Sequence, residues 1–248
     1  TLEETLAQIK PLDKTAMEMA AKRWDSIAKP LHSLGKMEKL VIQIAGITGS
    51  ADVSVKKRAL VPMCADNGVV EEGVTQTGQE VTAIVAENFL SGATSACVMS
   101  HQCGTDVIPV DIGMVVDTKV PTDLKIACGT ANMTKEPAMS REQAVQALEA
   151  GIEMVRRLKE EGYELLATGE MGIGNTTTSS AVAAVLLDRP TEEMTGRGAG
   201  LSGEGLARKI NAIKKAIEVN APDPEDAIDV LAKVGGFDIA GMAGMFLG

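Results

Sequence analysis

Aromatic residues are almost absent from this chain of 248 residues, which holds one Trp, one Tyr and three Phe. Proteins that bind single-stranded nucleic acid stack the bases on aromatic rings and follow the backbone with dense lysine and arginine. This chain offers neither feature, because its 24 Lys and Arg are outnumbered by 34 Asp and Glu, for a net charge of −10. We therefore expect no nucleic-acid partner.

Cysteine and histidine are also scarce. The two histidines are His32 and His101, and the four cysteines, which form no CxxC pair, are Cys64, Cys97, Cys103 and Cys128. The spacing of His101 and Cys103 matches no common structural zinc site, so we interpret the cysteines as reduced thiols that act as small buried hydrophobes. We expect no metal and no cofactor.

Long apolar runs and a signal-peptide pattern are missing as well. No uninterrupted apolar run reaches the ~18 residues that indicate a membrane span. We expect a cytoplasmic protein without a membrane partner. Hydrophobic residues still make up 45% of the chain. With so few aromatics, the core must be built from Ala, Val, Ile, Leu and Met.

Strand-like and helix-like segments alternate along most of the chain. Apolar runs at 59–65, 105–114 and 163–170 predict buried strands, each followed by a loop with acidic residues or glycine. Helical periodicity marks the segments between and after these runs, at 79–101, 140–162, 175–187, 202–219 and from Pro224 onward. The pattern predicts an α/β fold with a parallel sheet, whose ligands sit beyond the carboxyl ends of the strands.

The two ends of the chain differ from this pattern. An amphipathic helical segment at the start predicts a smaller domain at residues 1–45, followed by the α/β domain at 46–248. The last segment, 235–248, is apolar and helical in pattern but has no closing polar turn. We expect that a missing C-terminal segment or a partner chain covers it. An uncovered apolar helix would promote aggregation, so we predict a dimer.

A glycine-rich stretch, "GEMGIGNTTTSS", precedes the apolar helix that ends near residue 187. Helix N-terminal N–H groups suit a phosphate, and Gly172 and Gly174 let the backbone approach a ligand. Asn175 and Thr176 add side-chain hydrogen bonds. However, Glu170 in the same stretch would repel a phosphate. The glycine spacing fits neither a Walker loop nor a dinucleotide fingerprint, which argues against an NAD-dependent oxidoreductase.

A second glycine loop, "TGRGAGLSGEGLARK", resolves this conflict. Gly198 and Gly200 alternate with Arg197, and Lys209 follows within the next predicted helix. Glycine amides together with a lysine suit a phosphate monoester. We therefore expect the phosphate at this second loop, which leaves Glu170 free to meet sugar hydroxyls, a cationic ring or a proton.

Several motifs together resemble a known family. The segments "GEMGIGNTT", "GRGAGL", "VDIG" and "DNGVVEEGVTQTGQEVT" are similar to those of nicotinate-nucleotide–dimethylbenzimidazole phosphoribosyltransferases, and the similarity extends over nearly the whole chain. This resemblance implies a Rossmann-like sheet domain with a smaller helical domain built from the chain ends. It also implies phosphoribosyl transfer from nicotinate mononucleotide to an aromatic lower-ligand base in cobamide synthesis, without a cofactor.

The resemblance also implies roles for particular residues. Gly198 and Lys209 would hold the 5′-phosphate, while Glu170 and its loop would lie at the ribose and nicotinate. Gln79 would line the pocket of the acceptor base. The family's general base is a glutamate in a segment beyond Gly248, so this chain either continues to that glutamate or borrows groups from a partner. The alternative function is a non-catalytic nucleotide-binding subunit that completes the active site of a similar partner.

The acceptor pocket departs from the family pattern. The family usually has Asp-His-Gly where this chain has Asp66-Asn67-Gly68, and Pro-Gln where it has Gly78-Gln79. Asn67 and Gly78 change the polarity and the backbone freedom of the region where the family binds its acceptor. The sequence leaves both dimethylbenzimidazole and a phenolic acceptor open. Relatives that use phenol or p-cresol work as heterodimers, so a homodimer and a heterodimer both stay possible.

Overall fold

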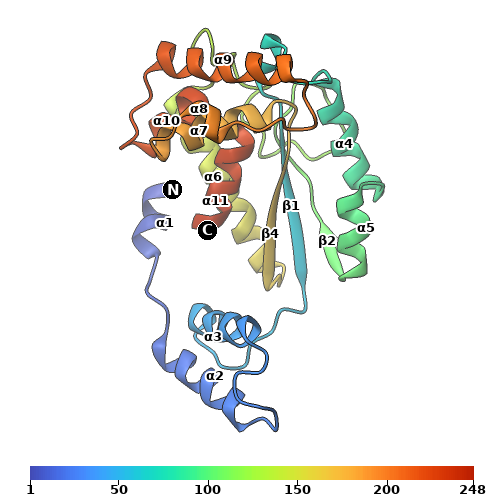
Figure 1. Ribbon diagram of the computed structural model, residues 1–248. Coiled ribbons are helices and arrows are strands. Elements are labelled where there is room, and N and C mark those ends of the chain that lie inside the picture. The colour runs from blue at the N-terminus through green and yellow to red at the C-terminus, as the bar shows by residue number, and fades with distance from the viewer. The chain divides into compact units, whose positions relative to one another are not determined.

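The structure is a computed structural model that describes residues 1–248. The chain divides into two compact units, one of residues 4–56 and one of residues 57–248 together with 1–3 (Figure 1). In the smaller unit, α2 (Lys14–Ser26) packs on α3 (Lys36–Thr48). The predicted boundary between residues 45 and 46 falls inside α3, which ends only where Gly49 adopts a left-handed conformation.

Local capping and one ion pair shape the smaller unit. The Asp13 side chain accepts the backbone N–H of Ala16 at 3.0 Å and so caps α2. Between the two helices, Lys29 pairs with Glu38 at 2.8 Å, and Glu38 also accepts the Leu34 N–H at 3.1 Å. Glu38 is buried, so this pair ties the connecting loop to the first turn of α3. α1 (Leu2–Gln8) begins in the larger unit, where the Leu2 N–H donates to Glu149.

The larger unit is built on a parallel sheet around one central strand, β1 (Arg58–Ala65). β4 (Leu165–Met171) pairs with one edge of β1, while β2 (Thr105–Val107) and β3 (Val110–Gly113) share the other edge. The predicted parallel α/β fold is confirmed. Sequence patterning predicted one strand at 105–114, but the segment is broken at Pro109, which has no backbone N–H to donate.

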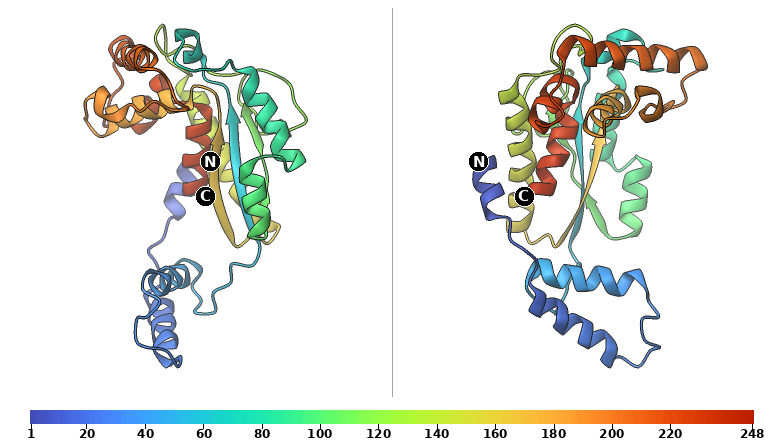
Figure 2. Two further views of the ribbon diagram at one scale, coloured as in Figure 1. Left: turned by 45° about the vertical axis from the view of Figure 1, so that its right-hand side comes forward. Right: turned by 60° about the vertical axis from the view of Figure 1, so that its left-hand side comes forward.

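Helices cover both faces of this sheet (Figures 1 and 2). α6 (Arg141–Glu160) and α11 (Phe237–Leu247) lie on one face, and α4 (Glu80–Ser91) and α5 (Ser95–Gln102) lie on the other. α6 begins with the capping box between Ser140 and Gln143 that the sequence predicted. The remaining helices surround the carboxyl ends of the strands and are η1 (Gly68–Glu72), α7 (Asn175–Leu186), α8 (Thr191–Met194), α9 (Gly203–Asn220) and α10 (Ala227–Val234).

Alternation along β1 divides the core between the two faces of the sheet. Cys64 points to the face covered by α4, where it packs with Ala86 and Phe89. The opposite face of β1 packs against α6 and α11 through Ala59, Val61, Met63 and Ala65. Both faces are covered, which is why the strand reads as a continuous apolar run in the sequence.

The segment 80–102 is apolar and long enough to resemble a membrane span by composition alone. In the structure it is two helices, because Gly92 adopts a left-handed conformation and ends α4, and Thr94 caps α5. A helix of the length of α4 rises about 18 Å at 1.5 Å per residue, well short of a ~30 Å hydrocarbon core. The Thr94 cap and the Gly92 turn thus separate two short surface helices.

The prediction that α11 is uncovered is wrong. Its buried residues include Phe237, Ala240 and Met245, and it packs along α6 and across β1. Only Phe246 near its end is strongly exposed. The apolar stretch therefore belongs to the core of the larger unit. Because α11 is covered, it gives no reason to expect a dimer. The dimer stays a prediction that this helix does not support.

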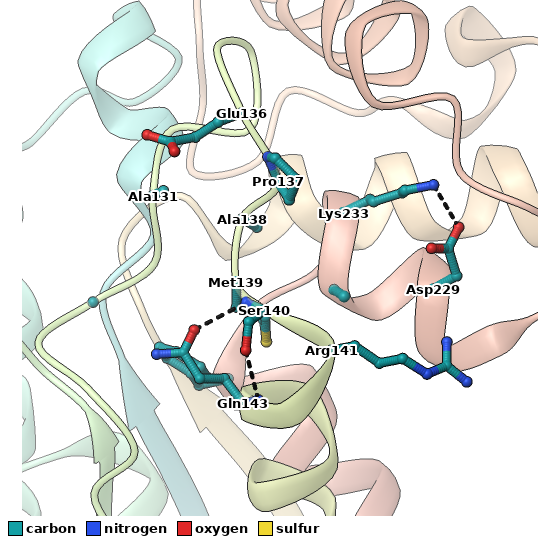
Figure 3. A pocket seen from close by; sticks show the side chains of 13 residues that line it. Ala131, Glu136, Pro137, Ala138, Met139, Ser140, Arg141, Gln143, Asp229 and Lys233 are labelled. Carbon is teal, nitrogen blue, oxygen red and sulfur yellow. Dashed lines mark hydrogen bonds and ion pairs between the residues drawn. The ribbon is translucent and has the colours of Figure 1, made fainter.

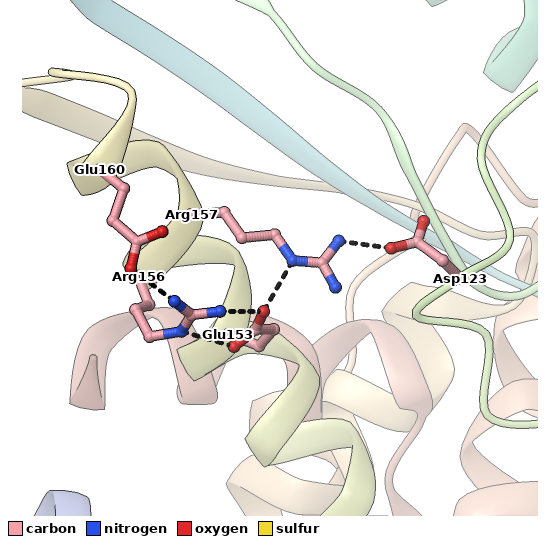
Figure 4. Close-up of polar contacts among 5 residues, drawn as sticks. All are labelled: Asp123, Glu153, Arg156, Arg157 and Glu160. Carbon is pink, nitrogen blue, oxygen red and sulfur yellow. Dashed lines mark hydrogen bonds and ion pairs between the residues drawn. The ribbon is translucent and has the colours of Figure 1, made fainter.

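A chain of ion pairs joins α6 to the loop that follows β3 (Figure 4). Arg157 pairs with Asp123 of this loop and, at 2.7 Å, with Glu153 of its own helix. Glu153 also pairs with Arg156, and the two arginines hold the pKa of the Glu153 carboxyl down to about 2. These side chains are largely exposed, so the pairs orient the loop more than they stabilise the fold.

Glycines allow α6 and α11 to touch at their backbones. A Cβ at Gly151 would lie 2.1 Å from the Gly241 carbonyl oxygen, so Gly151→Ala must push the two helices apart. We expect the variant to lose about 1–3 kcal/mol of unfolding free energy. Urea unfolding would measure this.

The matched control is Gly203→Ala, because nothing lies within 4 Å of a Cβ at Gly203 in α9. Both variants gain helix propensity from alanine, but only one creates a clash. A Gly151→Ala protein as stable as the Gly203→Ala protein would contradict the proposed close contact.

Candidate active site

The glycine turn between β4 and α7 is fixed by contact with the loop that follows β1. Gly174 has φ of +97°, a left-handed conformation that favours glycine. A Cβ at Gly172 would lie 2.2 Å from the Ala65 carbonyl oxygen, and one at Gly174 would lie 3.0 Å from the Asn67 Cβ. Both glycines are therefore needed for packing. Their contacts set the place where α7 begins.

A cavity of about 320 Å³ borders the N-terminus of α7. The structure brings the two glycine loops of the sequence together around it. The predicted residues that line it are Gly172, Gly174, Asn175, Thr176, Arg197, Gly198 and Lys209. The first N–H groups of α7 donate to the carbonyl oxygens of Gly172 and Gly174 and to Asn175 Oδ1. The positive end of the helix dipole still favours a negative charge at this end of α7. The cavity is therefore suited to an anion.

Lys209 gives the cavity its chemical character. The side chain comes from α9 and is buried, and its Nζ donates to Thr176 Oγ1 at 2.7 Å and to the Gly196 carbonyl oxygen at 3.3 Å. No carboxylate pairs with it, and burial lowers the pKa of the ammonium group. A buried charge without a counter-charge is unfavourable. An anion in this cavity would supply the missing charge.

Glu170 lies behind the cavity rather than in its wall. It is the penultimate residue of β4, and its carboxylate accepts a hydrogen bond from Asn175 Nδ2. Asn175 Oδ1 in turn accepts the Thr176 N–H at 2.7 Å, so Asn175 connects Glu170 to the cavity. Burial raises the pKa of the Glu170 carboxyl above its ordinary value, and the Asn175 hydrogen bond partly offsets this.

Four further predicted site residues lie outside the cavity wall. Asp66 and Asn67 are completely buried, and Asp66 Oδ2 accepts the Val115 N–H at 2.8 Å. Gln79 Nε2 donates to the Asn67 carbonyl oxygen at 3.3 Å. The fourth, Gly200, lies at the outer end of the second glycine loop. The side chain of Asn67 therefore packs into the protein instead of presenting a polar group to the cavity.

Sequence reasoning missed one wall of the cavity, the segment Val74–Thr77. Its Gln76 Nε2 donates to the Gly200 carbonyl oxygen at 2.6 Å, which bridges the two sides of the opening. The segment lacks the charge and glycine pattern that marks a phosphate loop. The signal that it did carry was a run of polar residues between two glycines, Gly73 and Gly78.

A second and larger cavity of about 540 Å³ lies beside the N-terminus of α6 (Figure 3). Its two cations are already paired, because Lys233 contacts Asp229 at 2.9 Å and Arg141 contacts Asp226 at 2.7 Å. The capping box occupies the Ser140 and Gln143 N–H groups. The smaller cavity is the better candidate, since its lysine has no carboxylate partner.

These features define a class of protein, an α/β protein with a lysine-lined cavity at a helix N-terminus beyond the carboxyl ends of parallel strands. The chain also matches a family model described as phosphoribosyltransferase over residues 9–248. It belongs to this phosphoribosyltransferase family.

Two relatives show how far the similarity extends. Both are named nicotinate-nucleotide–dimethylbenzimidazole phosphoribosyltransferase. The protein from Ruminiclostridium cellulolyticum is 53% identical over 250 residues, which cover 100% of this chain and 71% of the relative. The protein from Clostridium tetani is 51% identical over 249 residues, which cover 100% of this chain and 69% of the relative.

A solved structure is similar as well. The crystal structure of CobT from Thermus thermophilus matches with a TM-score of 0.86 and 37% sequence identity, over 94% of this chain and 70% of that chain. The likeness in sequence and structure confirms the family that the motifs indicated. The names of the relatives support the transferase prediction rather than the non-catalytic alternative.

Proposed function

We propose that this protein transfers the phosphoribosyl group of nicotinate mononucleotide to dimethylbenzimidazole and releases nicotinate, a step in cobamide synthesis. The observation that carries the proposal is Lys209, a buried ammonium group without a carboxylate partner that faces a cavity at the N-terminus of α7. The names of the relatives supply the donor and the acceptor.

The 5′-phosphate of the donor would occupy the cavity. Lys209 Nζ would donate to a phosphate oxygen in a charge-assisted hydrogen bond, in place of its present contact with Thr176. Gly198 leaves room for this, because a Cβ there would lie 2.8 Å from Thr176 Oγ1 and 3.4 Å from Lys209 Nζ. The positive end of the α7 dipole adds to an anion site of the kind that helix N-termini provide.

Glu170 would act on the ribose. In the transfer, the bond from C1′ to the nicotinate ring nitrogen breaks, and positive charge develops on the ribose ring before the acceptor nitrogen bonds to C1′. A carboxylate close to this charge stabilises the transition state more than the ground state. The Asn175 hydrogen bond fixes the Glu170 carboxylate for this role. The acceptor loses a proton to a general base.

Lys209→Met keeps the volume of the side chain and removes its charge. We expect the affinity for nicotinate mononucleotide to fall by roughly tenfold or more, because a charge-assisted hydrogen bond is worth about 1.5–3 kcal/mol. Calorimetry would measure the affinity. The matched control is Lys214→Met, since Lys214 lies on the same helix but pairs with Glu192 at the surface. Equal affinities for the two variants would remove Lys209 from the phosphate site.

Glu170→Gln should lower the turnover number by about a hundredfold while the dissociation constant changes little. Glutamine can still accept the hydrogen bond from Asn175, so the loop keeps its place. In the unsubstituted protein the turnover number should fall as the pH is lowered. The fall should begin at a pH above the usual pKa of a glutamate, because burial raises the pKa of Glu170. A variant that loses binding but keeps its turnover number would show that Glu170 only binds.

The acceptor is tested directly by incubation with nicotinate mononucleotide and each candidate base. We expect the α-ribotide of dimethylbenzimidazole, detected by chromatography and mass spectrometry. Phenol is a weaker candidate, since it attacks through a hydroxyl with a pKa of about 10 and needs a better-placed base. Product from phenol or p-cresol alone would show that the acceptor is phenolic.

A further inference from the structure

Asp238 is a buried carboxyl group that the proposed reaction does not use. It lies in the first turn of α11 and is completely buried. Its Oδ1 accepts the Ile239 N–H at 3.0 Å, but its Oδ2 has no hydrogen-bond partner. Asn67 is equally buried, and neither Oδ1 nor Nδ2 of its amide has a partner. Buried polar atoms of this kind are rare in folded proteins.

Two glycines show how these side chains lie. A Cβ at Gly172 would be 3.2 Å from Asp238 Oδ2 and 3.1 Å from Asn67 Nδ2. A Cβ at Gly236 would be 2.3 Å from Asp238 Oδ1 and 2.6 Å from Asn67 Oδ1. The amide nitrogen and one carboxyl oxygen thus converge beside Gly172, and the other two oxygens converge beside Gly236. The carboxyl and the amide lie side by side between the two glycines.

This arrangement can satisfy both groups only if the carboxyl carries a proton. The amide then donates to one carboxyl oxygen, and the acid O–H donates to the amide oxygen. An ionised carboxylate would leave two acceptor oxygens facing each other. Turning the amide over changes which carboxyl oxygen faces the amide oxygen, but not the need for the proton.

The surroundings favour this proton. Burial and, to a smaller extent, the carboxylate of Glu170 on β4 raise the pKa of Asp238 to about 7, although the Asn67 amide acts in the opposite direction. The Cys64 thiol on β1 also feels the charge of Asp238, but burial raises the pKa of this thiol to about 12, so it stays neutral. Asp66 and Asp111 also act on this thiol, but Glu170 is the carboxylate whose charge raises the pKa of Asp238.

We propose that Asp238 is a positioning residue. As a neutral acid paired with Asn67, it holds the loop after β1 against the glycine turn of Gly172–Gly174, and it leaves Glu170 as the ionised carboxylate behind the cavity. The effect on turnover rests on the function proposed above, whereas the pairing itself does not.

Asp238→Asn and Asp238→Leu separate the pairing from simple packing. Asparagine can pair with the Asn67 amide as the acid does, but leucine of similar volume leaves that amide unpaired. At pH 6 we expect Asp238→Asn to keep most of the turnover number and Asp238→Leu to lose about tenfold. Above pH 7 the unsubstituted protein should lose turnover as Asp238 ionises beside Glu170, and Asp238→Asn should lack this alkaline loss. Equal pH profiles would overturn the positioning role.

Two further measurements do not depend on turnover. The infrared spectrum near pH 5.5 should contain the band of a protonated carboxylic acid that Asp238→Asn removes. In the folded protein the pKa of Asp238 is raised to about 7, whereas the ordinary pKa of an aspartate is 3.8. The melting temperature of the unsubstituted protein should therefore fall relative to Asp238→Asn as the pH rises from about 4 to about 7, and then run parallel to it.

The outcomes are distinguishable. A missing acid band, or a constant difference in melting temperature from pH 4 to pH 8, would overturn the neutral pair. If the band and the melting temperatures come out as expected but no form of the protein makes a ribotide, the pairing is supported and the proposed function fails.

Discussion

The parallel pairing of β1 with β4 is the constraint on which the site depends. In this register Cys64 lies opposite Met171, so the loop after β1 and the glycine turn after β4 both leave the sheet at the carboxyl ends of the strands. Because Gly172 and Gly174 carry no side chain, the turn packs directly on the first loop. α7 therefore begins at a fixed place, with the positive end of its dipole beside the cavity.

Electrostatics then decides which chemistry this place can support. Lys209 reaches the cavity from α9 without a carboxylate partner, while Glu170 stays behind Asn175 on the other side of the turn. In the proposed reaction, this site offers the Lys209 cation to a phosphate and the Glu170 carboxylate to a developing positive charge. The opposite charges lie on different elements, so neither neutralises the other. This separation resolves the conflict that the glycine-rich sequence posed.

Much of this arrangement could be predicted from sequence. Alternating apolar runs and helical periods predicted the parallel sheet, and the two glycine loops supplied most of the predicted residues that line the cavity. Sequence reasoning overlooked the local signals at Gly92 and Thr94 that divide one long helical pattern. It could not show that α11 is buried, because that depends on packing between distant segments. It also could not show that Asn67 points into the core. That orientation follows from contact with α11, which lies far along the chain.

The central claim is that the donor phosphate binds beside Lys209, and a crystal structure of the protein with nicotinate mononucleotide tests it most directly. We expect a phosphate oxygen within hydrogen-bond distance of Lys209 Nζ and beside the N-terminus of α7, with the ribose toward Glu170. A phosphate bound instead in the larger cavity, beside Arg141 and Lys233, would contradict it.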